Sequence, residues 1–166
     1  MAYPTPQTCA PSPSPDGIVN VLVVEDDASA LDAMSSSLSG FGIRVRCAQG
    51  ISEATAKLRH TPCEVTAVSL RLPGRGALSM LNHVQRTHPD IEVLLIASPG
   101  DESAAQEAIA QGAFAVVSRP FTPDWLAANI FAAQRQASLR RQRAASASPS
   151  VPMTPTETSA SSQPKR

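Results

Sequence analysis

The stretch Asn20–Asp27, NVLVVEDD, constrains the fold of this chain more than any other. Four apolar residues run without a polar break and end in Glu25, Asp26 and Asp27. A short apolar run with β-branched residues predicts a strand buried on both faces, as in the centre of a parallel sheet. Ligands of such sheets bind beyond the carboxyl ends of the strands. The acids therefore either contribute to a cation site there or cap the following helix.

The two ends of the chain differ in composition from its middle. Residues 1–17 and 144–166 are rich in Pro, Ser, Thr and Ala and contain few large apolar side chains. Such segments bury too little apolar surface to offset the entropy lost on ordering, so we expect two disordered tails. The domain is predicted to span residues 18–135, and a basic extension of its last helix covers residues 136–143. The domain is long enough for one hydrophobic core.

Charge and cysteine content limit which partners and which cellular location the sequence favours. The 166 residues carry 14 basic and 14 acidic side chains, so no net charge draws the chain towards nucleic acid or a membrane. The longest apolar run is far shorter than a bilayer span, and no basic region followed by an apolar segment indicates a secretory signal. Cys9, Cys47 and Cys63 form no metal-ligand pattern, and reduced thiols fit a cytoplasmic location.

Strand and helix patterns alternate along the domain. After the first strand, the predicted strands are Gly42–Cys47, Val65–Leu70, Glu92–Ile96 and Phe114–Val117. The predicted helices are Ala28–Ser39, Ser52–Arg59, one around Leu78–Val84, one from Ser103 and one from Thr122. Helices between buried strands imply right-handed crossovers and a parallel sheet. The predicted fold is an α/β three-layer sandwich around a doubly wound, five-stranded parallel sheet.

This arrangement resembles the receiver domain of bacterial two-component response regulators, the CheY-like superfamily. The resemblance depends on four segments that occur in order: VLVVEDD, AVSLRLPG, PGDESAAQEAIAQGAF and SRPF. In that family an Asp at the end of the third strand accepts a phosphoryl group. Two acids after the first strand help to bind Mg²⁺, and a Thr or Ser and a Lys complete the site. The resemblance implies a flavodoxin-like fold and a role in two-component or phosphorelay signal transduction.

The site residues of the family can be carried over position by position. Glu25 and Asp26 match the acidic pair. Ser69 stands at the phosphoacceptor position, Ala97 at the Thr or Ser position, and Arg119 at the Lys position. Val116 stands where many members carry a Tyr or Phe that moves on activation.

These departures predict a degenerate pseudo-receiver that is not phosphorylated. A serine hydroxyl is a poor nucleophile without an adjacent base, and no Asp occurs between Asp32 and Asp90 to replace it. Arg in place of Lys exchanges a compact ammonium for a planar fork. Arg119 could instead pair with Glu25 or Asp26 and imitate one fixed state. No cofactor is required, although the two acids could hold Mg²⁺ weakly.

We therefore predict a stand-alone, non-enzymatic module that acts by protein–protein interaction. In receiver domains the face of the fourth helix, fifth strand and fifth helix commonly dimerises or binds partners. Here that face would carry Gln106, Trp125 and Asn129. Trp125 is the only tryptophan, and it either anchors an interface or packs over the start of its helix.

Two alternatives from other classes stay open. The first is a Mg²⁺-dependent phosphoryl-handling receiver with an atypical acidic site. The second is a nucleic-acid-associated regulator that uses a patch of arginines without a nearby acid, Arg135, Arg140, Arg141 and Arg143. Cations near the C-terminal end of a helix explain these arginines more simply, and no DNA-binding unit follows them. We expect neither nucleic acid nor a membrane as a partner.

Overall fold

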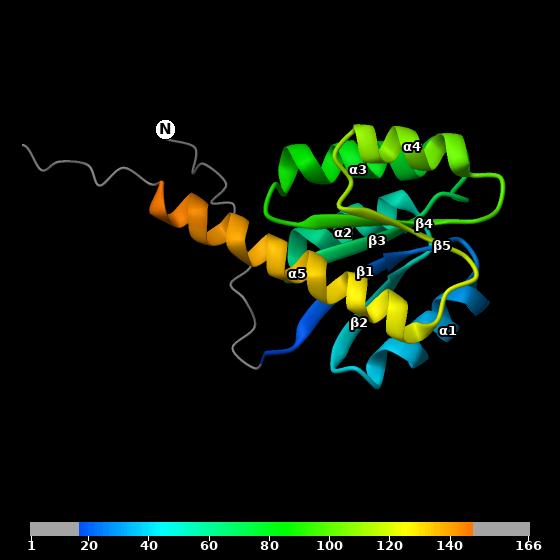
Figure 1. Ribbon diagram of the computed structural model, residues 1–166, viewed down its shortest axis with the longest axis horizontal. Coiled ribbons are helices and arrows are strands. Elements are labelled where there is room, and N and C mark those ends of the chain that lie inside the picture. The colour runs from blue at the N-terminus through cyan, green and yellow to red at the C-terminus, as the bar shows by residue number, and fades with distance from the viewer. Residues whose placement is uncertain (1–16, 148–166) are drawn as a thin grey trace, which may run out of the picture.

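The computed structural model describes residues 17–147, in which five β-strands alternate with five α-helices (Figure 1). The strands are β1 (Val19–Val24), β2 (Ile43–Ala48), β3 (Val65–Ser69), β4 (Glu92–Ala97) and β5 (Ala115–Ser118). The helices are α1 (Ala28–Ser39), α2 (Ile51–His60), α3 (Gly76–Thr87), α4 (Glu102–Ala110) and α5 (Pro123–Ser146). The predicted elements are confirmed, with small differences at their ends, because apolar spacing does not define where the last hydrogen bond falls.

The strands form one parallel sheet in the order β2-β1-β3-β4-β5. This order reverses direction at β1, which is the doubly wound arrangement. Helices α2, α3 and α4 pack on one face through a core that includes Leu58, Leu81 and Ala108. Helices α1 and α5 cover the other face through residues such as Leu38 and Ile130. The predicted three-layer α/β sandwich is confirmed.

Two helix caps shape the carboxyl-terminal edge of the sheet. The Asp27 side chain accepts hydrogen bonds from the backbone N–H groups of Ser29 (2.9 Å) and Ala30 (3.4 Å) at the start of α1. Thr122 caps α5 in the same way and accepts from the N–H of Trp125 at 3.3 Å. Asp27 therefore has the capping role that the sequence left open for the acids after the first strand.

Helix α5 is longer than the others and extends past the sheet. It contains 24 residues without a break, and Ala137 is its last buried residue. Figure 1 shows its C-terminal end, coloured orange, beyond the ends of the strands. The predicted basic extension, residues 136–143, is part of this helix.

The boundary of the C-terminal tail differs from the prediction. Residues 144–146 belong to α5, because the alanines at 144 and 145 favour continuation of a helix. The remaining residues of both predicted tails lie outside the described residues, except for Gly17 and Ala147. Within residues 17–147, no helix combines the length and apolar character that a membrane crossing requires.

Candidate functional site

The carboxyl-terminal edge of the sheet opens into a cleft of about 460 Å³. Its lining residues are Glu25, Asp26, Asp27, Ala30, Arg71, Ser98 and Arg119. They come from the loops that follow β1, β3, β4 and β5 and from the first turn of α1. The cleft therefore forms where the acidic end of the first strand predicted a site.

An ion pair between a half-buried arginine and a buried glutamate crosses this cleft. Arg119 Nη2 lies 2.9 Å from Glu25 Oε2, and the Glu25 side chain is 3% exposed. The other carboxylate oxygen of Glu25 accepts backbone N–H groups from Asp26 (3.1 Å) and Asp27 (3.4 Å). The sequence left open which acid Arg119 would contact, and it is Glu25.

The surroundings of Glu25 change its acidity in opposing directions. Burial raises the pKa of the Glu25 carboxyl above its ordinary value, and the Asp26 side chain adds to this rise. Hydrogen bonds from the Ser69 hydroxyl and the Asp27 backbone, together with the charge of Arg119, act to lower the pKa. The upward effects are larger, so these donors only partly compensate the loss of water around the carboxylate.

Ser69 is the last residue of β3 and is 1% exposed. Its side chain makes a hydrogen bond with the Glu25 carboxylate, and its oxygen accepts the backbone N–H of Arg71 at 3.2 Å. Because an ionised carboxylate is only an acceptor, the Ser69 hydroxyl is the donor to Glu25. The sequence offered no adjacent base for Ser69, but in the fold its neighbour is this carboxylate.

The acids of the cleft form a poor donor set for Mg²⁺. Glu25 is bound to Arg119, and Asp27, although exposed, caps α1, so Asp26 is the exposed acid of the three without either role. Mg²⁺ favours carboxylates that are free to enter an octahedral shell. Among the described residues, no group of three or more His, Cys, Asp or Glu side chains is placed to hold a metal ion.

A second hollow, of about 640 Å³, lies between α4 and β5 beside the cleft. Its lining includes Ala97, Ile109 and Val116, and Gln106 lies at the same groove. Ala97 is buried and offers no hydroxyl. Val116 is half-buried and packs against the core on the α3 and α4 side. Small side chains at 97 and 116 thus leave an apolar groove next to the charged cleft.

Residues 21–131 match the response regulator receiver domain family. The chain belongs to this family. The receiver domain is 31% identical over 104 residues to the DNA-binding transcriptional regulator NtrC of Salmonella typhimurium, a match that covers 63% of this chain and 22% of NtrC. The chain thus spans about a fifth of the length of the first curated relatives it matches.

Solved structures agree with the receiver fold. A response regulator receiver domain protein from Clostridium thermocellum is similar with a TM-score of 0.70 and 22% identity, covering 74% of this chain and 99% of that one. NtrX from Brucella abortus is similar with a TM-score of 0.71 and 26% identity, covering 76% of this chain and 29% of that one.

Sequence reasoning missed two residues that line the cleft of this receiver domain. Arg71 directly follows the predicted strand Val65–Leu70, and it lies at the cleft. Its place two residues after Ser69 was the signal that could have found it. Ser98 lines both the cleft and the groove, and the site assignment stopped one residue earlier, at Ala97. Counting along the chain could not decide which of these neighbours faces the cleft.

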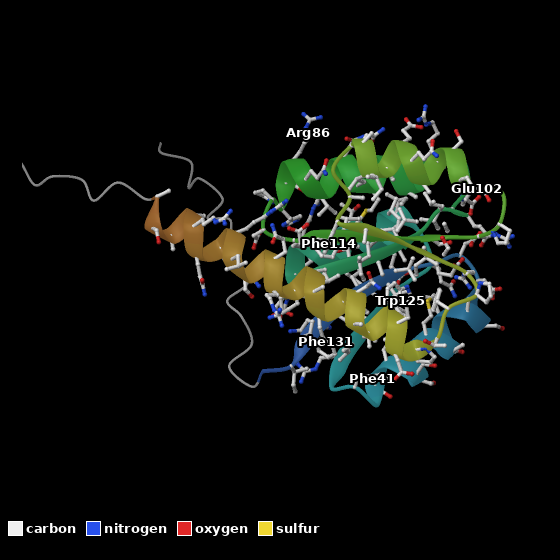
Figure 2. The ribbon with its side chains drawn as sticks, in the orientation of Figure 1. Phe41, Arg86, Glu102, Phe114, Trp125 and Phe131 are labelled. Atoms are coloured by element: carbon white, nitrogen blue, oxygen red, sulfur yellow. The ribbon has the colours of Figure 1, made fainter. Side chains whose placement is uncertain are left out.

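The three predicted interface residues lie on two helices. Gln106 is exposed on α4. Trp125 is 59% exposed near the start of α5, and the Asn129 side chain donates to its backbone carbonyl at 2.8 Å. Figure 2 places Trp125 and Phe131 along α5. The indole is therefore mostly open to solvent, and its role in an interface stays a prediction.

The arginines near the end of α5 do have acids beside them, contrary to the sequence-based view. Arg140 Nε lies 2.9 Å from Glu92 Oε1, and Arg141 Nη1 lies 4.0 Å from Asp90 Oδ2. Both acids come from the start of β4 and the loop before it. They are remote from α5 in the sequence, so only the fold brings them close. Two of the four arginines are thus paired within the domain.

Proposed function

We propose that this receiver domain works by phosphorylation-independent contact with a protein partner in a two-component or phosphorelay pathway. The observation that carries the proposal is the Glu25–Arg119 pair with Ser69 bound beneath the same carboxylate. These three residues occupy the positions that resemble the family's acidic, lysine and phosphoacceptor positions. Ser69 and Arg119 both bind the Glu25 carboxylate.

The chemistry of this set argues against aspartyl phosphorylation. Ser69 offers no carboxylate to form an acyl phosphate, and its hydroxyl is buried. Glu25 is neutralised by Arg119 at 2.9 Å, which weakens its attraction for a cation. Ala97 supplies no hydroxyl to contact a phosphoryl group. We propose a domain without enzymatic activity or a required cofactor, and with at most weak Mg²⁺ binding.

The partner face is proposed to be the side formed by α4, β5 and the start of α5. It combines the apolar groove at Val116 with Gln106 at its rim and the exposed Trp125 and Asn129. Exposed tryptophans in such settings often dominate binding energy. A homodimer through this face is a form of the same proposal. Action without further domains stays a prediction, as does a cytoplasmic location.

One observation favours a rival function in which Ser69 itself is modified. Its hydroxyl contacts the Glu25 carboxylate, and an adjacent carboxylate can accept a proton from a serine that attacks a phosphoryl donor. The product would be a phosphoserine, which survives acid, whereas an acyl phosphate on an acid side chain hydrolyses readily. Burial of Ser69 opposes this rival.

Incubation with acetyl phosphate and Mg²⁺, followed by intact mass spectrometry, tests the proposal. We expect no phosphoryl adduct on the wild-type chain or on Ser69→Ala. A known phosphorylatable receiver domain serves as the positive control for the reagent. An acid-stable adduct that Ser69→Ala removes would establish the rival function. A labile adduct on any Asp or Glu would refute the proposed loss of phosphorylation.

A further inference from the structure

The last turns of α5 lie beyond the hydrophobic core. Ala137 is the last buried residue of the helix, and Leu139, which follows it, is 42% exposed. Short helical segments in water are marginally stable unless a tertiary contact supports them. Residues 138–146 therefore depend on something other than core packing to remain against the domain.

Two ion pairs supply that contact. Arg140 reaches Glu92 at 2.9 Å, and the Glu92 side chain is 3% exposed. Arg141 lies 4.0 Å from Asp90, and its side chain is only 14% exposed. Both pairs join α5 to the amino-terminal edge of the sheet, at the opposite end from the Glu25–Arg119 pair.

The two ion pairs leave several buried polar atoms without a hydrogen bond. Arg141 Nη1 and Nη2, Asp90 Oδ2 and Glu92 Oε1 are buried atoms that lack a hydrogen bond of good geometry. A buried polar atom without a hydrogen bond destabilises the folded state, because it has lost its contact with water and gained no partner. Burial also raises the pKa of Glu92, and the charge of Arg140 offsets this only in part. The contact is thus held by charge, without a complete set of hydrogen bonds.

We propose that residues 138–146 of α5 form a releasable arm, which the Arg140–Glu92 and Arg141–Asp90 pairs hold against the start of β4. Loss of either charge frees the arm. Release exposes both arginines beside Leu139 and changes the direction in which the chain leaves the domain. The domain itself remains folded, because its core ends at Ala137.

Other charged groups near the arm define what a change of pH can do. Besides the residues of the two ion pairs, they are Glu64, whose backbone carbonyl accepts the N–H of Glu92 at 3.2 Å, and His88, which interacts electrostatically with Asp90. Burial lowers the pKa of His88, and Asp90 opposes this. Glu64 Oε2 accepts the backbone N–H of Asn20 at 2.6 Å, so Glu64 is engaged with β1. Glu92 is the carboxylate that Arg140 contacts directly.

Hydrogen exchange of the full chain, followed by mass spectrometry, tests the arm. We compare the wild type with Arg140→Gln, with Glu92→Gln, and with Arg143→Gln as the matched control on the same helix. Arg140→Gln and Glu92→Gln are expected to speed exchange of amides 141–146 about fivefold to thirtyfold. Arg143→Gln is expected to leave these amides unchanged, and β4 amides should be protected equally in all four proteins.

The outcomes separate the arm from a passive helix end. Wild-type exchange rates in both Arg140→Gln and Glu92→Gln would overturn the proposal, as would an equal increase in Arg143→Gln. A second readout uses pH, after correction for the intrinsic exchange rate. Between pH 7 and pH 5 the wild type should approach Glu92→Gln at amides 141–146. A constant difference over this range would also overturn the role of Glu92.

Discussion

The two edges of the sheet each hold a buried glutamate paired with an arginine. Glu25 meets Arg119 at the carboxyl-terminal edge, and Glu92 meets Arg140 at the amino-terminal edge, both at 2.9 Å and both with the glutamate 3% exposed. Burial raises the pKa of both acids. By these measures the two pairs are alike.

They differ in what else supports the acid. Glu25 also accepts hydrogen bonds from Asp26, Asp27 and Ser69, and its arginine leads directly from β5 into the cleft. The cation beside Glu92 comes from a helix segment beyond the core. A buried charge with several donors belongs to the folding unit, whereas one with a single cation on a segment beyond the core can change its environment locally. The same pair of residue types thus gives a rigid site at one edge and a releasable contact at the other.

The largest expected effect comes from adding a second negative charge beside Glu25 at the carboxyl-terminal edge of the sheet. Ser69→Asp places a second buried carboxylate beside Glu25, so we expect a loss of about 2–3 kcal/mol in the free energy of unfolding at pH 7. Mg²⁺ should restore part of this loss in the variant and leave the wild type nearly unchanged, because the new carboxylate adds a ligand. Urea denaturation with and without Mg²⁺ measures both effects. Equal stability of Ser69→Asp and wild type would contradict the closed arrangement of the site.

Removal of the cation at the rigid edge should have a smaller, global effect. Arg119→Ala leaves the Glu25 carboxylate with its three remaining donors, and we expect a loss of about 1–2 kcal/mol. Arg119→Lys keeps the charge without the planar fork and should recover part of the loss. Thermal denaturation compares the three proteins. If Arg119→Ala unfolds at the wild-type temperature, the pair does not hold the site in one state.

At the amino-terminal edge of the sheet, where the arm makes its contact, Glu92→Gln should leave the free energy of unfolding unchanged or raise it by up to about 1 kcal/mol. Neutralising a buried acid removes its desolvation cost, and the arm that it releases contributes no residue to the hydrophobic core. Urea denaturation followed by circular dichroism measures this, with Arg143→Ala as an exposed control expected within about 0.5 kcal/mol of wild type. A clear decrease in the free energy of unfolding of Glu92→Gln would mean that the contacts at the two edges of the sheet are equally rigid.

The smallest expected effect is that the difference in free energy of unfolding between wild type and Glu92→Gln changes with pH. The pKa of Glu92 is raised above its ordinary value of 4.5 in the folded state, so the unfolded chain loses its proton first as pH rises. The wild type therefore loses stability as pH rises through the interval above 4.5 and is more stable, relative to Glu92→Gln, at pH 5 than at pH 7. Urea titrations of wild type and Glu92→Gln at pH 5 and pH 7 measure this difference in the free energy of unfolding. If the advantage of Glu92→Gln over wild type is larger at pH 5 than at pH 7, the predicted direction is wrong.

The sequence was sufficient for the fold and for placing the candidate site residues at strand ends, because both follow from local patterns. Apolar runs and capping residues place each strand end, so Glu25, Ser69 and Arg119 could be assigned to one edge before their contacts were known. Their partners could not be assigned, because side-chain rotamers decide whether Arg119 meets Glu25 or Asp26. The acids beside Arg140 and Arg141 were missed, since they lie in a distant segment that meets α5 only in the folded domain.

The internal Glu25–Arg119 pair has a consequence for how a signal could be carried. A switch that depends on a covalent group has a lifetime, set by the rates at which the group is added and lost. Two side chains of one chain that already neutralise each other need no such event. If the domain acts without phosphorylation, as proposed, occupancy of a partner follows the amounts of the two proteins by mass action. Synthesis and degradation, rather than modification, would then set the strength and duration of the signal.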